Sequence, residues 1–337
     1  MILAGDVGGT KVALALVEPG NGRFRVRREA RFETSDYGNL AAVLREFLGG
    51  EQADAACFGV AAPILSGSPI EMTNLDWTFD QGRLAAEIGI ERVSFINDLA
   101  ATALGIDALD ADAFAALHEG TPRGDTAAII AAGTGLGMAI LTGEGGSPRV
   151  MPSEGGHQAF APRTDLESEL LAFLRGHHPD HVSAERVVSG PGIQAVYEFL
   201  RESGREEEPR WLAERLADSE DRSLEISRAA LAGRPPICVA ALKTFAGCYG
   251  SAAGDLALAA LALRGIYVAG GIAPDILPIL RAGPFMDAFR AKGRMGNLLA
   301  DVPVFVLVEP LAPLLGAARW ASLVAEAGRP RKDEPRQ

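Results

Sequence analysis

Two glycine-containing turns in this sequence have the residue types that could bind a phosphate group. The first is GDVGGT, residues 5–10, where an acid, two adjacent glycines and a threonine separate two apolar runs. Glycines let backbone N–H groups approach a ligand, and successive N–H groups form an anion-binding nest. Asp6 could hold a hydrated Mg²⁺ that phosphates also bind. Taken alone, this stretch also fits an ordinary hairpin with an aspartate in its turn.

The second turn is GTGLG, residues 133–137, and it also lies between two apolar strand-like runs. Two such turns, one of them with an acid, favour a phosphate clamp over two unrelated hairpins. Other phosphate-binding motifs do not fit, because the sequence has no G-x-x-x-x-G-K-[ST] and the spacing at 133–137 is not G-x-G-x-x-G. The H-R-D and D-F-G pair of protein kinases does not occur either.

Polar residues with a second kind of chemistry follow other apolar runs. Asn97 and Asp98 stand where SFI is expected to pass from a strand into a helix. They could cap that helix, or they could serve a site at the strand end. Glu154 and His157 flank two glycines in SEGGH, and a carboxylate and an imidazole there could both turn toward one ligand and bind its hydroxyl groups. The alternative for that pair is a solvated surface loop. Glu185, in SAERVVSGPG, is a further candidate for ligand binding, and its alternative is an ordinary position on a helix surface.

The elements that would position these residues form a repeated pattern. The hydrophobic spacing predicts strands at 2–6, 11–17 and 24–31, a helix at 38–48, strands at 55–64 and 91–96, and a helix at 97–106. Strand, glycine turn, strand, hairpin and strand recur in 126–151, a further strand ends in glycines within 265–274, and 163–262 is mostly helical. A strand at 302–308 and a helix at 312–327 end the pattern. Two such units would face each other across a cleft with the glycine turns on its walls.

Composition limits the class of protein. The chain has 337 residues, and this length exceeds the usual size of a domain with one hydrophobic core, which suggests two domains. With 48% hydrophobic residues the chain can bury a sizeable core. A net charge of -12 disfavours nucleic acid and anionic membrane surfaces as partners. Three cysteines without a C-x-x-C pair, and a Met1 that leads directly into a strand, favour a cytoplasmic protein with reduced thiols. Residues 236–263 are read as one buried helix or two abutting ones, and not as a membrane span.

Eight sequence blocks together resemble a known superfamily, that of sugar kinases, heat-shock ATPases and actin, and more closely the bacterial glucokinases of the non-zinc type. The blocks occur in family order and extend to about residue 320: GDVGGT (5–10), MTNLDW (72–77), INDLAA (96–101), GTGLG (133–137), PSEGGHQAFAP (152–162), SAERVVSGPG (183–192), VAGGIAP (268–274) and LLGAA (314–318). Lys11, and Ser153 in place of an expected glycine, depart from the pattern.

The resemblance implies an α/β fold of the two-lobed, ribonuclease H-like (actin-like ATPase) class, with a cleft between a small and a larger domain. The small domain would comprise residues 1–107 and 312–328, the larger one residues 108–311, and residues 329–337 would form a disordered tail. The resemblance also implies a homodimer.

The activity that the resemblance implies is phosphorylation of D-glucose at its 6-hydroxyl by ATP, with Mg²⁺, giving glucose 6-phosphate and ADP in glycolysis. Asp98 would be the catalytic base, and the sugar would be bound by Asn74, Asn97, Asp98, Glu154, His157 and Glu185. Asp6 would hold Mg²⁺ through water, and ATP would be bound by Gly5, Asp6, Val7, Gly8, Gly9, Thr10, Gly133, Thr134, Gly135, Gly270 and Gly271. A kinase of another hexose or amino sugar and a non-catalytic sugar-binding regulator remain alternatives.

Overall fold

The structure is a computed structural model that describes residues 1–20, 24–62, 64, 69–72, 77–143 and 148–327. Asn74 and the tail at 329–337 lie outside these residues. The chain divides into two units. The first comprises Met1–Ala111, Gly143–Pro152 and Glu309–Gln337, and the second comprises Asp112–Thr142 and Ser153–Val308.

The first unit is built on a five-stranded sheet in the order β3-β2-β1-β4-β7. Its first three strands form an antiparallel meander, and β4 and β7 then add in parallel to β1. The strands are β1 (Ile2–Val7), β2 (Lys11–Pro19), β3 (Phe24–Glu33), β4 (Ala55–Val60) and β7 (Val93–Asn97), with a separate pair of β5 (Ile70–Glu71) and β6 (Thr78–Phe79).

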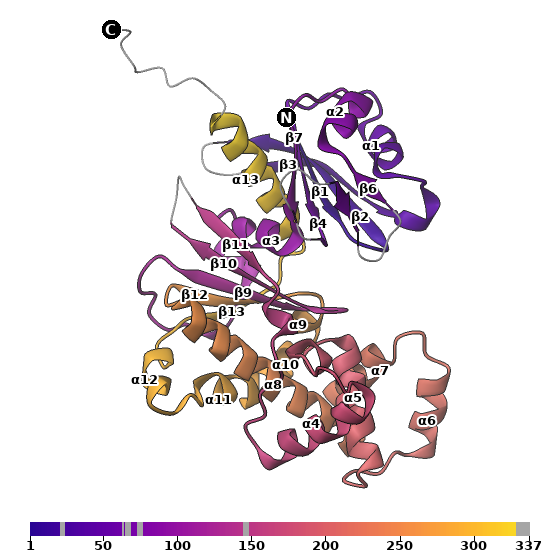
Figure 1. Cartoon of the computed structure of the whole chain (residues 1–337), viewed down its shortest axis with the longest axis vertical. Coiled ribbons are helices and arrows are strands. Elements are labelled where there is room, and N and C mark those ends of the chain that lie inside the picture. Colours follow the sequence, from indigo (N-terminus) through magenta and orange to yellow (C-terminus); the bar gives the residue numbers. More distant parts are fainter. Residues whose placement is uncertain (21–23, 63, 65–68, 73–76, 144–147, 328–337) are drawn as a thin grey trace. The chain divides into compact units, whose positions relative to one another are not determined.

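Helices pack against this sheet, and Figure 1 shows α13 (Ala312–Ala327, yellow) beside the indigo strands β1 and β4 and helix α3 (Asp98–Ile106). Glycines allow α3 and α13 to approach closely. A Cβ on Gly316 would lie 1.7 Å from the carbonyl oxygen of Ala101, and a Cβ on Gly105 would lie 2.2 Å from that of Ala312. The remaining helices of this unit are η1 (Thr34–Asp36), α1 (Leu40–Leu48) and α2 (Gln81–Ile88).

The six-stranded sheet has the order β11-β10-β9-β12-β13-β8. Its strands are β8 (Phe114–His118), β9 (Ala127–Ala132), β10 (Leu136–Thr142), β11 (Arg149–Ser153), β12 (Gly265–Ala269) and β13 (Val304–Leu307). Strand β12 is parallel to both β9 and β13, whereas β10 is antiparallel to β9 and β8 is antiparallel to β13.

Helix α8 (Pro236–Ala260) runs through the hydrophobic core of the second unit, and Figure 1 shows it among the helices coloured pink to orange. It is one continuous helix of 25 residues, which decides between the one-helix and two-helix interpretations of 236–263. No helix within the described ranges has the length and apolar character needed to span a membrane. The other helices of this unit are η2 (Ala111–Ala113), which begins at its boundary, η3 (Gly155–His157), α4 (Asp165–His177), η4 (Ala184–Arg186), α5 (Gly190–Glu202), α6 (Arg210–Ala217), α7 (Arg222–Leu231), α9 (Ile272–Asp275), α10 (Leu277–Arg281), α11 (Pro284–Arg290), η5 (Gly293–Met295) and α12 (Gly296–Leu299).

The repeated pattern seen in the sequence is present in both sheets. The order β3-β2-β1-β4-β7 of the first sheet corresponds to β11-β10-β9-β12-β13 of the second. The sequence missed β8, a strand whose residues are all only partly buried, and it placed the end of β4 at residue 64 instead of Val60. The α/β fold class is confirmed.

Candidate active site

The turn between β1 and β2 is closed by its own backbone and held by Thr34. Gly8 donates its N–H to the carbonyl oxygen of Lys11 at 2.9 Å. Thr34 donates its backbone N–H to the Thr10 carbonyl at 2.9 Å and its hydroxyl to the Gly9 carbonyl at 2.8 Å. Carbonyl oxygens repel phosphate, so their attachment to the buried Thr34 suits a turn that binds a phosphate with its amides. Sequence reasoning missed Thr34.

Asp6 and its two neighbours lie on opposite faces of β1, because side chains alternate along a strand. Gly5 and Val7 are buried, and a Cβ on Gly5 would lie 2.5 Å from Cδ1 of Phe58. Both residues therefore pack in the core, and their contribution to nucleotide binding stays a prediction. Asp6 is half-buried and lies on the other face of the strand.

A glycine in the neighbouring strand allows the start of α3 to approach Asp6. Asp6 pairs with Gly59 of β4 in the parallel register. A Cβ on Gly59 would lie 3.5 Å from the Cα of Asp98 and 3.2 Å from the Cβ of Ala101. The first turn of α3 thus lies over Gly59, next to the strand that carries Asp6. Gly59 was not identified from the sequence, although a glycine inside a buried strand often marks a close backbone approach.

The two carboxylates Asp6 and Asp98 interact electrostatically. Burial raises the pKa of Asp6 to about 6, and the negative charge of Asp98 contributes to the rise. Arg31 opposes it from the same row of the sheet, since Asp6 pairs with Ala13 and Ala13 pairs with Arg31. A half-buried carboxyl beside a second carboxylate is a place where a cation would be bound favourably.

The junction of β7 and α3 fixes Asn97 and Asp98. Asn97 is the N-cap of α3, and its side-chain oxygen accepts from the N–H groups of Leu99 and Ala100, each at 3.1 Å. Oδ1 of Asp98 accepts from the Leu99 N–H at 2.8 Å. The capping interpretation therefore holds for Asn97. Its cap uses only the amide oxygen, so the side-chain NH₂ is the group that could bind a sugar hydroxyl.

The glycine turn of the second unit lies between β9 and β10. Gly133 donates its N–H to the carbonyl oxygen of Gly135 at 2.9 Å, and its own carbonyl accepts from the N–H of Gly190, the first residue of α5, at 2.8 Å. A Cβ on Gly133 would meet no atom within 4 Å, and Thr134 is exposed. The turn is thus anchored by α5 on one side and open on the other.

Gly270 and Gly271 follow β12, the strand that is parallel to β9. Gly270 has a φ of +84°, and a Cβ there would lie 2.2 Å from the carbonyl oxygen of Ala132. Only glycine fits this combination of backbone angle and contact. Gly271 is the N-cap residue of α9, with open space where its Cβ would be. The two glycine segments of the second unit therefore lie side by side at the carboxyl ends of neighbouring parallel strands.

Glu154 and His157 stand at the two ends of η3, which packs closely on β10. A Cβ on Gly156 would lie 1.9 Å from the carbonyl oxygen of Leu136, and a Cβ on Gly155 would lie 2.6 Å from the sulfur of Met138. The two glycines of SEGGH are thus required by packing. Glu154 and His157 are exposed.

Glu185 belongs to the same neighbourhood as the second glycine turn. Its carboxylate accepts from the N–H of Leu136 at 3.0 Å, and a Cβ on Gly135 would lie 2.6 Å from its Oε2. The segment that carries it pairs with the loop after η3, because Ala184 donates its N–H to the carbonyl of Gln158 at 2.8 Å. Glu185 therefore connects the loop of Glu154 and His157 with the glycine turn, a contact that the sequence did not predict.

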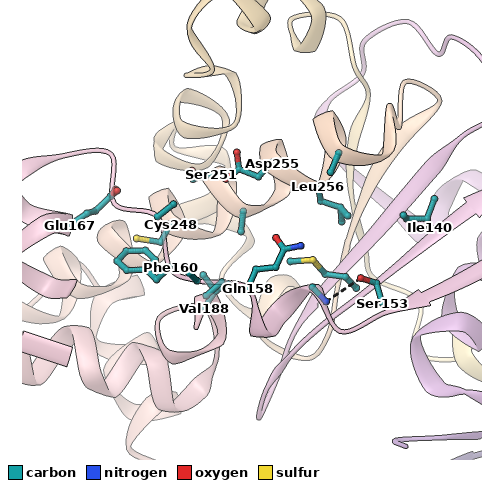
Figure 2. A pocket seen from close by; sticks show the side chains of 17 residues that line it. Ile140, Ser153, Gln158, Phe160, Glu167, Val188, Cys248, Ser251, Asp255 and Leu256 are labelled. Carbon is teal, nitrogen blue, oxygen red and sulfur yellow. Dashed lines mark hydrogen bonds between the residues drawn. The ribbon is translucent and has the colours of Figure 1, made fainter. Parts of the chain in front are cut away.

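A pocket of about 200 Å³ lies behind this loop, between β10 and α8. Figure 2 shows Gln158, Cys248 and Asp255 among the side chains that line it, and the hydrogen bond from the Gly155 N–H to the hydroxyl of Ser153 at 3.1 Å. Its lining also includes Glu167, a buried carboxylate that is paired with Arg163 at 2.6 Å. Glu154 and His157 do not belong to this lining, so the pocket and the predicted sugar ligands are different features.

Comparison with known proteins gives a consistent result. The family model described as Glucokinase matches residues 3–324. The glucokinases of Nostoc punctiforme and Synechocystis are each 40% identical to this chain, with alignments that cover 96% and 95% of it and 99% and 97% of the relatives. The crystal structure of a glucokinase from an Antarctic psychrotroph is 34% identical, with a TM-score of 0.83, and the match covers 95% of this chain and 98% of that one.

A more distant structure supports the fold alone. It is the ROK family glucokinase from Streptomyces griseus, described in complex with glucose and AMPPNP, and it is 21% identical with a TM-score of 0.65, covering 95% of this chain and 99% of that one. The fold and the glucokinase matches together identify a sugar kinase of the ribonuclease H-like, actin-like ATPase class. The chain belongs to the glucokinase family.

Proposed function

We propose that this chain transfers the terminal phosphoryl group of ATP to the 6-hydroxyl of D-glucose, giving glucose 6-phosphate and ADP in glycolysis. The observation that carries the proposal is the proximity of Asp6, beside a phosphate-binding type of turn, to Asp98 at the start of α3. Phosphorylation of an alcohol by a nucleotide requires both a proton acceptor and a place for a cation. The glucokinases at about 40% identity support glucose as the acceptor.

In this reaction the sugar's 6-oxygen forms a bond to the γ-phosphorus of ATP, and the bond from that phosphorus to the β–γ bridging oxygen breaks. The proton of the 6-hydroxyl passes to the carboxylate of Asp98, and ADP leaves. The transition state of phosphoryl transfer is loose, so positioning and charge neutralisation matter more than the strength of the base. The α3 cap holds Asp98 for this task through the Leu99 N–H.

We assign the nucleotide to the glycine segments that the sequence singled out. These are the turn at 5–10, Gly133–Gly135, and Gly270 with Gly271. Gly133 and Gly271 have open space at their Cβ positions, which suits a close approach of phosphate or adenosine to the backbone. Thr10 and Thr134 are exposed and could donate their hydroxyls.

We assign the sugar hydroxyls to Asn97, Asp98, Glu154, His157 and Glu185, and also to Asn74. Carboxylates accept from paired hydroxyls, and the imidazole and amide can donate. Glu154 and His157 are exposed, and the Glu154 carboxylate makes no capping hydrogen bond at η3, so both side chains are accessible to a ligand.

Mg²⁺ fits the residues at Asp6. The carboxyl of Asp6 is half-buried, its pKa is raised to about 6, and a second carboxylate, that of Asp98, contributes to the rise. A divalent cation there would reduce the repulsion between the two carboxylates and offset the cost of burying a negative charge. Asp6 would hold the ion through water, and when bound the ion would neutralise charge on the phosphate oxygens.

We also propose a cytoplasmic homodimer. The cysteines Cys57, Cys238 and Cys248 are all buried free thiols, which is in keeping with a reducing compartment.

The direct test is a coupled assay of the purified protein with ATP and Mg²⁺ against a panel of hexoses and amino sugars. Glucose should give the highest kcat/KM, and excess EDTA should abolish turnover. A higher kcat/KM for fructose, mannose or an amino sugar would replace glucose as the substrate. Glucose binding without any phosphoryl transfer would instead identify a sugar-binding regulator. Sedimentation velocity of the same sample tests the dimer.

The role of Asp98 can be separated from its structural role by Asp98→Asn. Asparagine keeps the acceptor oxygen for the Leu99 N–H and leaves the Asn97 cap intact, so the variant should melt near the wild type. It cannot take a proton, and kcat should fall on the order of 10²-fold, the lower end of the usual effect because the transition state is loose. Asp36→Asn, at an exposed position of the same unit, is the control. A normal kcat for Asp98→Asn would remove Asp98 from the catalytic role.

A further inference from the structure

Tyr249 lies in the middle of α8 and is fully buried. Its ring makes edge contacts with Phe245 and Phe285, with centroids 5.7 and 5.6 Å apart. Such contacts from two sides fix the plane of the ring. The phenol hydroxyl is thereby directed at the sheet of the second unit.

The hydroxyl makes its hydrogen bonds at the carboxyl ends of β9 and β12. It accepts from the N–H of Ala132 at 3.1 Å, and it can donate its single proton to the carbonyl oxygen of Ile130 at 3.1 Å or to that of Ala269 at 3.2 Å. The register of the two parallel strands runs to Ala131 paired with Ala269. In a parallel ladder the next main-chain hydrogen bond would join the N–H of Ala132 to the carbonyl of Ala269. The Tyr249 hydroxyl occupies that place and bridges the two groups.

Both glycine segments of the second unit begin immediately beyond this bridge. Gly133 follows Ala132, and Gly270 follows Ala269, with its backbone in contact with the carbonyl of Ala132. The separation of the two strand ends, and hence of the two segments, therefore depends on an oxygen atom inserted between them.

We propose that Tyr249 is a positioning residue for the nucleotide: its hydroxyl sets the spacing between Gly133–Gly135 and the Gly270–Gly271 segment. This inference rests on the proposed kinase function. Loss of the hydroxyl would leave a buried N–H unpaired unless the two strand ends close up and pair directly, and that closure would move both segments. Displacements of about 1 Å at a reacting site can cost on the order of 10²-fold in rate.

The test is Tyr249→Phe, which keeps the ring and removes only the hydroxyl. Tyr197→Phe is the matched control, because Tyr197 is equally buried in the same unit but its hydroxyl donates to Glu208 at 2.6 Å instead of to the sheet. Wild-type turnover of glucose is measured first, so that failure of the kinase function is recognised separately. We expect Tyr249→Phe to raise the KM for ATP about 10-fold while the KM for glucose stays within about twofold of the wild type. Tyr197→Phe should change neither KM.

Titration calorimetry with glucose and with an unreactive ATP analogue checks the same split in binding. Equal losses for both ligands, or equal effects of the two tyrosine variants, would overturn the proposal. If Tyr249→Phe does not fold, hydrogen exchange of the wild-type protein decides. The ATP analogue, but not glucose, should then slow exchange of the Ala132 amide, and an unchanged rate would refute a link between this bridge and the nucleotide.

Discussion

Replacing Asp6 by asparagine should stabilise the free protein at neutral pH while it abolishes phosphoryl transfer. The aspartate is held as a half-buried carboxyl whose pKa is about 6, raised first by burial and then by the charge of Asp98. Asparagine has nearly the same shape and no charge. The free protein would therefore lose a repulsion, and the enzyme would lose the carboxylate assigned to Mg²⁺.

The magnitude follows from the difference between the ordinary pKa of 3.8 and the value of about 6 in the folded state. Each unit corresponds to about 1.4 kcal/mol, so the charged side chain costs up to about 3 kcal/mol, and about 1–3 kcal/mol after allowance for relaxation. Below about pH 4 both folded and unfolded states hold the proton and the cost vanishes. It grows as pH rises from 4 to 6, where only the folded state retains the proton, and it is constant at higher pH.

The assay is a series of thermal melts from pH 4 to 8 in EDTA for the wild type, Asp6→Asn and the exposed control Asp36→Asn. The melting temperature of Asp6→Asn relative to the wild type should rise with pH and level off above about pH 6, whereas Asp36→Asn should run parallel to the wild type. If the difference in melting temperature between Asp6→Asn and the wild type does not change with pH, the charged Asp6 carboxylate does not destabilise the fold. The cation site inferred from its raised pKa would then lose its basis.

Three further predictions test the second unit. Gly270→Ala should lower the melting temperature and weaken binding of an ATP analogue, because residue 270 has a φ of +84° and its Cβ would lie 2.2 Å from the Ala132 carbonyl oxygen. Gly271→Ala, where the Cβ position is open, should melt like the wild type, and equal melting temperatures of the two variants would refute this packing. Gly156→Ala should raise the glucose KM more than the ATP KM, since a Cβ 1.9 Å from the Leu136 carbonyl must displace η3, and steady-state kinetics would contradict this if both constants rose together. Glu185→Gln should raise both constants, because the amide oxygen can still accept from the Leu136 N–H but the bond loses its charge assistance, worth about 1 kcal/mol, and an unchanged ATP KM would rule out that coupling.

Much of the fold could be predicted from the sequence, because the relevant signals are local. Strand and helix periodicity located β1 to β3, α1, α3, β9 to β11 and α13, and the repeated strand, glycine turn and strand pattern indicated two related units. The strand β8 was missed because its residues are only partly buried on both faces and show no alternation. The candidate residues themselves were found by type, position at strand ends and resemblance to a family.

The supporting contacts could not be predicted, because each joins residues that are far apart in the chain. Thr34 holds the carbonyls of the first turn from 25 residues away, and the Tyr249 hydroxyl reaches Ala132 across 117 residues. Glu185 was expected only as a sugar ligand, and its contact with the Leu136 amide depends on how η4 docks beside β10.

The sequence by itself determined which residues can do chemistry and the order of the elements that carry them, since glycine turns, caps and hydrophobic periods are properties of short segments. Tertiary structure alone decided the electrostatics and the precision of the site. The pKa of Asp6 depends on burial and on Asp98, which is far from it in the sequence. Asp98 can approach because Gly59, in the neighbouring strand β4, has no side chain. Burial exists only in the folded chain, and the repulsion between two carboxylates weakens with distance and is screened by water and salt, so both effects require packing to bring the segments together.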